Sequence, residues 1–354
     1  MERKKVGILT FHRADNFGAA LQCYALQEVL KSLGNDVEII NYKQPYIEKI
    51  YNPITTLCKV LKKPHWWMGY LYRVGPNELK RYIKFKSFRR RYFNTGTAFN
   101  DNKNIPDKYH TIIIGSDQVW ALRCTNGIDE IFFGEFPHNN SKVVGYGISG
   151  NILSLEEIGN ERLKTYCRNF DKISFREEGF KGYIKENIGV EGDLVLDPTL
   201  LLDKNKWGKI TNNVGHPGNY ILTYILQYGE NWSRINEYIS HFAKKTDCKV
   251  INIFDVAHSP TEFLGWVKNA KYIITTSFHA TIFSIIFEKQ FYAIKTNNGY
   301  DARYTNLLTK LNIADRAIEL EDLINIKTIT TDYNSIKERL DELKKKSLNY
   351  LERI

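Results

Sequence analysis

Apolar residues in the first part of the chain follow a strand period, then a helix period, and then a strand period again. Residues 5–11 form an apolar run rich in β-forming side chains. Residues 19–33 place leucine, alanine and valine at helical spacing, and Gly34 follows as a helix stop. Residues 37–42 form a second apolar run. A strand, a loop, a helix and a strand in this order predict the start of a parallel, doubly wound sheet.

The same alternation returns after residue 110 and continues toward the C-terminus. Strands that end in small or polar residues are predicted at 111–114, 142–149, 172–175 and 194–196. After a Gly- and Pro-containing stretch at 212–219, strands are predicted at 220–225, 249–253, 272–275 and 291–294, with helices at 232–245, 260–269 and 280–287. A chain of 354 residues fits two domains of this kind. We therefore predict Rossmann-like domains at 1–211 and 212–330 and an amphipathic C-terminal helix at 331–354.

Residues 43–100 interrupt the alternation with a segment rich in proline, tryptophan, tyrosine, lysine and arginine. We predict an irregular or helical insertion in the first domain. Within it, residues 59–92 interleave basic and aromatic side chains. Three interpretations stay open: contact with an anionic membrane surface near a lipid-linked substrate, binding of nucleic acid, and a solvated face over a small satellite core.

Charge and the spacing of reactive residues narrow the classes of function. The chain carries 50 lysines and arginines against 40 acidic residues, and its net charge of +10 favours anionic partners. The five cysteines are scattered without a CxxC pair, which argues against a disulfide framework or zinc site and favours a reducing compartment. The eight histidines lack HxxxH and HExxH spacing, so no metal site is predicted. The loop at 12–18, after the first predicted strand, contains Gly18 but lacks the GxGxxG spacing of a dinucleotide-binding loop, and no GxxxxGK phosphate loop is present.

The apolar runs are too short for targeting or for membrane insertion. A signal peptide needs roughly 7–15 consecutive apolar residues, and a transmembrane helix needs about 20. The run that begins the chain ends sooner than either. We therefore expect a cytoplasmic protein.

Five segments, in order, resemble the polysaccharide pyruvyl transferase family. They are GILTFHRADNFGAALQCYALQ at 7–27, IIIGSDQVW at 112–120, ISFREE at 173–178 with LVLDPTLLLD at 194–203, EFLGWVKNAKYIITTSFHATIFSIIFEKQF at 262–291, and DARYTNLLTKLNI at 301–313. Together they span nearly the whole chain apart from the insertion and the tail. The resemblance implies an α/β fold of two Rossmann-like domains with a cleft between them, similar to glycosyltransferases of the B type.

The resemblance also implies a reaction. A pyruvyl group moves from phosphoenolpyruvate to a pair of sugar hydroxyls and forms a ketal, during the biosynthesis of a bacterial surface polysaccharide such as a capsule or exopolysaccharide. Phosphoenolpyruvate is then a co-substrate, and no cofactor is expected. The second partner is a sugar acceptor, either free or lipid-linked. A lipid-linked acceptor implies an enzyme at the inner face of the membrane.

Two other functions stay open as alternatives. One is a nucleotide-sugar-dependent glycosyltransferase of similar fold. The other, from a different class, is a basic nucleic-acid-binding protein. The chain contains no RNA- or DNA-binding motif, and its excess charge concentrates in the insertion and the tail. Nucleic acid is therefore not the predicted partner.

Phosphoenolpyruvate carries a carboxylate and a phosphate, so its site needs fixed cations or helix N-termini together with an acid or base. Arg176 directly follows a predicted strand and can hold an anion with two parallel hydrogen bonds; the alternative is an ion pair with Glu177 or Glu178. Ser277 is a candidate N-cap and donor ligand. His279, in the first turn after it, is the first candidate for proton transfer; the alternative is a structural histidine.

The chain departs from the family pattern around this histidine. Many members have Arg-Leu-His-Gly, whereas this chain has Phe278-His279-Ala280, so the basic residue before the histidine is absent. Arg303 is a further candidate for the donor anion, and a salt bridge within its own loop is the alternative.

Polar residues at two strand ends of the first domain are candidates for the acceptor or for an anion. Asp117, between Ser116 and Gln118, can orient or deprotonate a sugar hydroxyl, or it can cap the next helix. Asn16 and Gly18 precede a helix, where backbone N–H groups can hold an anion or a hydroxyl; turn chemistry is the alternative.

Overall fold

The computed structural model describes residues 3–53, 76–100, 105, 107–138, 140–215, 217–226, 232–296, 301–326 and 331–354. It divides into two compact units: unit 1 is Met1–Leu201 with Lys345–Ile354, and unit 2 is Leu202–Lys344. The boundary between the two units follows Leu201, whereas the sequence pattern predicted a domain boundary after residue 211. The stretch 59–75 of the basic insertion lies outside the described residues.

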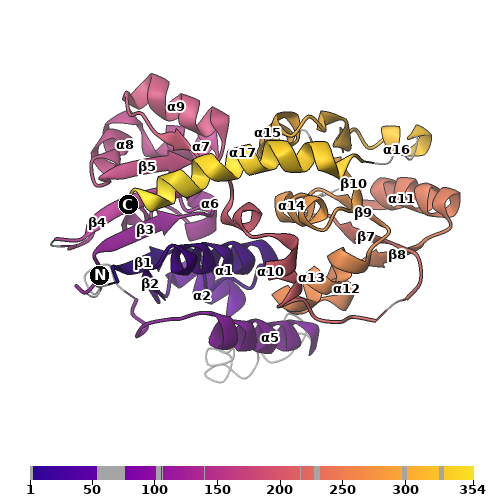
Figure 1. The fold of residues 1–354 in the computed structure, drawn as a ribbon, viewed down its shortest axis with the longest axis horizontal. Helices are drawn as coiled ribbons and strands as arrows, with labels where there is room; N and C mark the ends of the chain where they lie inside the picture. Colours follow the sequence, from indigo (N-terminus) through magenta and orange to yellow (C-terminus); the bar gives the residue numbers. More distant parts are fainter. Residues whose placement is uncertain are drawn as a thin grey trace, which may run out of the picture. The chain divides into compact units, whose positions relative to one another are not determined.

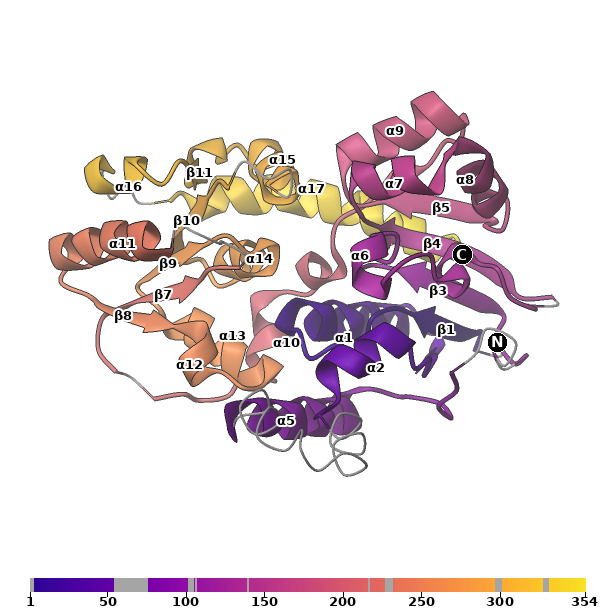
Figure 2. The same cartoon turned by 180° about the vertical axis from the view of Figure 1, so that it is seen from behind.

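Unit 1 contains a parallel sheet with the strand order β2-β1-β3-β4-β5-β6. Helix α1 lies on one face of this sheet, and α2 and α6 lie on the other (Figures 1 and 2). The strands are β1 (Lys5–Leu9), β2 (Asp36–Ile39), β3 (Thr111–Gly115), β4 (Lys142–Ile148), β5 (Lys172–Phe175) and β6 (Asp193–Leu194). The α-helices are α1 (Phe17–Ser32), α2 (Pro45–Tyr51), α5 (Pro76–Tyr92), α6 (Leu122–Thr125), α7 (Ile152–Ile158), α8 (Asn160–Cys167) and α9 (Glu178–Ile188), with 3-10 turns η2 (Glu130–Phe133) and η3 (Pro198–Leu201).

Unit 2 repeats the arrangement with the parallel order β8-β7-β9-β10-β11. The strands are β7 (Tyr220–Tyr224), β8 (Lys249–Asn252), β9 (Tyr272–Thr275), β10 (Gln290–Ile294) and β11 (Ala317–Ile318). The helices are α10 (Lys204–Gly208), α11 (Trp232–Thr246), α12 (Ile253–Val256), α13 (Pro260–Asn269), α14 (Phe278–Ile286), α15 (Ala302–Lys310), η4 (Ala314–Arg316) and α16 (Asp322–Asn325). Helix α17 (Tyr333–Glu352) begins in unit 2 and ends in unit 1.

Most predicted elements are confirmed to within two residues at each end. Helix α1 starts earlier than expected, at Phe17, because Asn16 caps it: the Asn16 Oδ1 accepts from the backbone N–H of Ala19 at 3.1 Å. Gly18 therefore lies inside the first turn and not before the helix. At the other end, Gly34 has a φ of +88°, as a helix stop requires.

Each unit has an aromatic centre that is closed to solvent. In unit 1, the Trp120 ring stacks on Phe133 at 5.0 Å, and its Nε1 donates to the Phe132 carbonyl at 3.0 Å. In unit 2, the Trp207 and Phe263 rings meet Phe283 edge-on. Trp120 and Trp207 are fully buried, so these aromatic residues serve as core.

The end of α17 completes the core of unit 1. The Ser347 Oγ accepts from the backbone N–H of Leu196 at 2.9 Å, and the Tyr350 hydroxyl donates to the Gly145 carbonyl at 2.8 Å. Lys172 lies over the Tyr350 ring at 4.1 Å. The last residues of the chain thus pack beside β4 and β5.

None of the helices in the described part of the chain is long and apolar enough to cross a bilayer.

Candidate active site

The carboxyl ends of β1 and β3 lie side by side in unit 1, because the two strands pair in parallel with Leu9 opposite Ile114. The next strand along the chain, β2, pairs with the opposite side of β1, so this is the point where the strand order reverses and where open α/β sheets bind ligands. Gln22 of α1 reaches this point, and its Nε2 donates to the Thr10 Oγ1 at 2.9 Å. Its Oε1 is buried and has no hydrogen-bond partner among the described residues.

The segment Ser116, Asp117 and Gln118 turns away from the end of β3. Gly115 begins the turn with a φ of +122°, and a Cβ there would lie 2.2 Å from the Tyr146 carbonyl oxygen, so only glycine fits. Asp117 is partly buried, and its Oδ1 accepts from the backbone N–H of Gln118 at 2.8 Å. The buried Ser116 Oγ and Gln118 Nε2 have no partner within the described chain.

Arg176, directly after β5, is the centre of a buried ionic cluster. Its Nε donates to Glu177 at 3.0 Å and its Nη1 to the Asp197 carboxylate at 2.8 Å. Nη1 and Nη2 also donate to the Ser116 carbonyl and the Ser149 Oγ. The side chain is only 3% exposed. Burial opposes the charge, but the Glu177 and Asp197 carboxylates prevail and raise the pKa of Arg176.

This cluster matches the ion-pair alternative for Arg176, with one difference. The sequence suggested a surface pair with Glu177 or Glu178, whereas the pair with Glu177 is buried and includes Asp197. The second oxygen of Glu177, Oε2, is buried without a partner among the described residues. Arg176 therefore fixes the position of the Ser116 segment and the two carboxylates.

The loop between β1 and α1 carries a second set of buried polar groups. His12 contacts the Thr10 carbonyl and the Asn41 Oδ1, and burial lowers its pKa to about 4. Asp15 pairs with Arg89 of α5 at 2.6 Å, yet burial raises the pKa of Asp15 to about 6.

The corresponding strand ends in unit 2, those of β7 and β9, are joined by hydroxyl groups. The Thr275 Oγ1 donates to the Tyr224 carbonyl at 2.6 Å. The Thr276 Oγ1 accepts from the backbone N–H of Leu226 at 2.8 Å. No charged side chain takes part in these hydrogen bonds, which link the two strand ends directly.

His279 lies in the first turn of α14, as predicted. Ser277 is the N-cap, with its Oγ accepting from the backbone N–H of Ala280 at 3.4 Å. The His279 ring is partly buried and meets the Phe278 ring edge-on at 5.3 Å. The backbone N–H groups of a first helical turn point toward the helix start and favour negative charge there.

Arg303 brings a cation to the same helix start. Its guanidinium lies 5.9 Å from the centre of the Phe278 ring, the residue before His279. Asp301, two residues before Arg303, accepts from Thr296 and from the Tyr304 hydroxyl. The ring contact places Arg303 beside the position where this chain lacks the basic residue of the Arg-Leu-His-Gly pattern.

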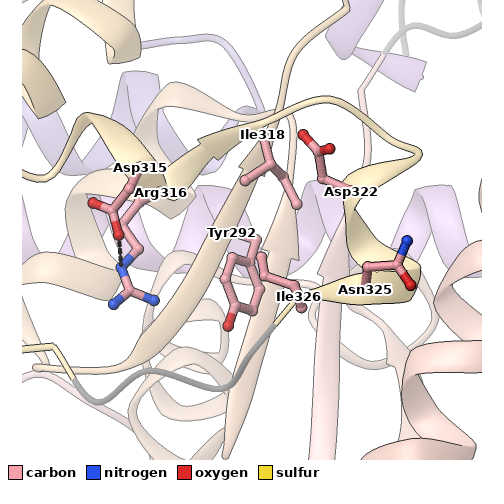
Figure 3. Close-up of a pocket in the computed structure, with 7 residues that line it drawn as sticks. All are labelled: Tyr292, Asp315, Arg316, Ile318, Asp322, Asn325 and Ile326. Carbon is pink, nitrogen blue, oxygen red and sulfur yellow. Dashed lines mark ion pairs between the residues drawn. The ribbon is translucent and has the colours of Figure 1, made fainter.

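A separate cavity of about 340 Å³ lies along β10, β11 and α16 in unit 2. Figure 3 shows Tyr292, Ile318 and Ile326 in its wall, with Arg316 and Asp315 to one side and Asp322 and Asn325 to the other. None of the candidate residues lines this cavity.

A family model described as polysaccharide pyruvyl transferase matches residues 16–298. The match covers most of the chain and includes the segments that carry Asn16, Ser116, Arg176 and His279. The chain belongs to the polysaccharide pyruvyl transferase family. It is therefore a transferase by family, and none of the functionally curated proteins matches it significantly.

Solved structures of low sequence identity align with nearly the whole chain. A protein of Listeria monocytogenes assigned as a UDP-N-acetylglucosamine 2-epimerase aligns with a TM-score of 0.50 and 8% identity, over 97% of this chain and 91% of that one. The spinosyn rhamnosyltransferase SpnG aligns with a TM-score of 0.46 and 9% identity, over 99% and 100%. The match to the Listeria protein, together with the two parallel sheets of this chain, confirms the predicted fold of two Rossmann-like domains.

The candidate residues of the pyruvyl transferase thus form two groups, one in each unit. The unit 1 group lies at or just after the strand ends and comprises Asn16, Gly18, Ser116, Asp117, Gln118 and Arg176, which was predicted to bind the donor. Ser277, His279 and Arg303 lie around the start of α14 in unit 2.

Four polar residues of unit 1 were not predicted as site residues from the sequence. Gln22, Ser149, Glu177 and Asp197 take part in the buried hydrogen bonds of this edge. Ser149 directly follows β4, Glu177 lies two residues after β5, and Asp197 lies three residues after β6. A search of the polar residues just after every strand would therefore find these three. Gln22 lies inside a helix, where no such search applies. In the described residues, no group of three or more His, Cys, Asp or Glu side chains is arranged to hold a metal ion.

Proposed function

We propose that this pyruvyl transferase moves the pyruvyl group of phosphoenolpyruvate onto two hydroxyls of a sugar during the assembly of a bacterial surface polysaccharide. The observation that carries the proposal is the family match, which spans the polar strand ends of both units. The acceptor that we propose is lipid-linked.

The chemistry needs one proton delivered and two removed. The methylene carbon of phosphoenolpyruvate takes up a proton and becomes a methyl group, which leaves oxocarbenium character at the neighbouring carbon. One sugar hydroxyl adds to that carbon, phosphate leaves, and the second hydroxyl closes the ketal. Of the two hydroxyl protons, one balances the new methyl group and the other leaves with phosphate. At least one positioned acid or base is therefore required.

We assign the donor to unit 2. The start of α14 provides a helix dipole, the His279 imidazole and, beside Phe278, the Arg303 guanidinium. In this proposal Arg303 supplies the cation that other family members carry before the histidine, and His279 transfers a proton. Ser277 acts through its cap, which fixes the first turn of α14.

We assign the acceptor to unit 1. A sugar presents hydroxyls that both donate and accept, so its site needs groups of both kinds. The buried Ser116 Oγ, Gln118 Nε2 and Glu177 Oε2 have these properties, and the described residues supply no partners for them. Buried polar groups of a native protein are normally hydrogen-bonded, so a water or a ligand is needed here. Asp117 is the candidate base, Asn16 and Gly18 border the same edge, and Arg176 positions the Ser116 segment.

The decisive experiment follows both products at once. Purified protein is incubated with phosphoenolpyruvate and a panel of free and lipid-linked sugars, and phosphate release is measured beside the mass of the sugar. The proposal expects phosphate release together with a pyruvyl ketal on one acceptor. Turnover of a nucleotide sugar, with no product from phosphoenolpyruvate across the panel, would establish the glycosyltransferase alternative instead.

A further inference from the structure

Helix α5 exposes a face that combines aliphatic and basic side chains. Leu79 is 46% exposed and Ile83 is 56% exposed, and both belong to the small set of large apolar residues that face solvent. Lys86 and Arg90 continue the same face at i+7 and i+11 from Leu79, and both are exposed. Exposed Lys80 and Arg91 flank this line, and Glu78 is the acidic residue of the helix.

The opposite face of α5 is fixed to unit 1. Phe85 and Phe88 are buried, and the Phe85 ring stacks on Phe17 of α1 at 5.6 Å. Arg81 donates to the Asp15 carbonyl at 2.7 Å, and Arg89 pairs with the Asp15 carboxylate. The basic residues of α5 therefore fall into two sets, one that holds the loop before α1 and one that faces solvent.

We infer that the outer face of α5, formed by Leu79, Ile83, Lys86 and Arg90, binds the surface of an anionic lipid bilayer. A helix that lies in a membrane interface presents apolar side chains to the acyl boundary and lysine or arginine to the headgroups. The cations Lys86 and Arg90 complement anionic headgroups, and Leu79 and Ile83 continue the same line toward the start of the helix. The exposed apolar residues of the face are aliphatic and cannot stack on bases, which favours lipid over nucleic acid.

The same helix would place the acceptor edge near the bilayer. Arg81 and Arg89 hold Asp15, which is followed by Asn16, the cap of α1. This consequence rests on the proposed function, because it assumes that Asn16 borders the acceptor. The lipid contact itself does not depend on the reaction.

The test uses the full chain and vesicles made from equal parts of phosphatidylglycerol and phosphatidylcholine, with no substrate present. The double variant Lys86→Gln with Arg90→Gln should lower the partition coefficient about 30-fold, since each cation near an anionic surface contributes about fivefold. The control variant Lys209→Gln with Lys268→Gln removes the same charge from exposed positions of unit 2 and should bind as the wild type does. Ile83→Ser should weaken the binding that persists at high salt.

Each outcome decides the inference. Loss of binding in the α5 variant together with retention in the control supports it. Equal losses in both variants would show that only net charge matters, and no binding by the wild type would reject a lipid surface. Binding of an RNA or DNA oligonucleotide, abolished by the same α5 variant in the absence of vesicle binding, would assign the face to nucleic acid. Turnover of phosphoenolpyruvate with a soluble sugar is measured separately, and the α5 variant should retain it.

Discussion

The two units order their strands in the same way, but the residues at the carboxyl ends of their strands differ in charge and burial. In unit 1 this edge holds the guanidinium of Arg176 between two carboxylates, all of them buried. In unit 2 hydroxyl groups join the strand ends, and the ionisable His279 is only partly buried. In unit 1 the charged side chains pair with one another. In unit 2 the charged group, the Arg303 guanidinium, lies beside the start of α14. The topology sets the place of a site, and the residues after the strands set its chemistry.

The comparison predicts the largest effect for His279, and that effect should be on catalysis alone. His279→Gln keeps hydrogen-bonding capacity and similar bulk but cannot transfer a proton near neutral pH. We expect kcat to fall by roughly 10²–10⁴, with little change in the melting temperature or in the KM for phosphoenolpyruvate. Initial rates at varied phosphoenolpyruvate, beside a thermal melt, measure both. Early melting with a parallel loss of activity would make His279 structural.

Arg176 should show the opposite behaviour, because its partners are internal. Arg176→Met leaves the Glu177 and Asp197 carboxylates buried without their cation, and breaking a buried pair in this way costs about 3–5 kcal/mol. Urea unfolding should show this loss. Arg176→Lys keeps the positive charge but not the several N–H donors of the guanidinium, and it should lose less stability than Arg176→Met. If Arg176→Met unfolds at the urea concentration of the wild type and binds phosphoenolpyruvate more weakly, Arg176 is a donor ligand after all.

Acid pH should separate two groups of the loop between β1 and α1. Burial lowers the pKa of His12 to about 4, so between about pH 6.5 and 4 the unfolded chain binds the proton first and stability falls on acidification. Burial raises the pKa of Asp15 to about 6, so between about pH 6 and 4 the folded protein binds the proton first and stability rises on acidification. At about 1.4 kcal/mol per pKa unit, each group changes the free energy of unfolding by about 3 kcal/mol over its pH range. The two changes have opposite signs.

Removing one group should expose the slope of the other. His12→Gln is expected to gain stability relative to the wild type as the pH falls from about 6 to 4, and Asp15→Asn is expected to lose it. Urea midpoints at several pH values measure the difference. Parallel profiles for the wild type and both variants would contradict the assignment of the two slopes to this loop.

The smallest expected effects come from the N-caps of α1 and α14, where the same substitutions can be compared at Asn16 and Ser277. Asn16→Ala and Ser277→Ala should each cost about 1 kcal/mol of stability, because each removes the side chain that accepts from the first turn. Ser277→Asp keeps a cap and adds negative charge beside the proposed donor. It should keep the stability but raise the KM for phosphoenolpyruvate, whereas Asn16→Asp should leave that KM unchanged. Equal KM values for phosphoenolpyruvate in Ser277→Asp and Asn16→Asp would contradict the assignment of the donor site to the start of α14.

Much of the fold follows from local pattern, because parallel strands buried on both faces are short apolar runs that end in polar residues. The strand at 172–175 and the helix at 260–269 agree with the structure at both ends. The 3-10 turns and the two-residue strand β11 were not predicted, because elements this short show no period. The two-residue strand β6 was predicted, at 194–196. The start of α1 depended on a cap hydrogen bond, which the spacing of apolar residues does not reveal.

The site was predictable to a smaller extent. Ser277 as cap and His279 in the first turn follow from a short polar residue before an apolar helix. The surroundings of Arg176 did not follow, because Asp197 is 21 residues away and only the sheet brings it close. The proximity of Arg303 to Phe278 likewise depends on how α15 packs against α14. Pairings of this kind are set by tertiary structure, and a single sequence carries no record of them.

The end of α17 has a consequence for how the protein is made. Most of unit 1 precedes unit 2 in the chain, yet Ser347 and Tyr350, which bind the Leu196 N–H and the Gly145 carbonyl, follow it. At about 5–20 residues per second, the whole of unit 2 is synthesised in roughly 7–30 seconds, and during that time unit 1 lacks the end of α17. The core of nascent unit 1 therefore cannot close until residues 345–354 have been made. A fragment that ends at residue 201 would remain in that unfinished state.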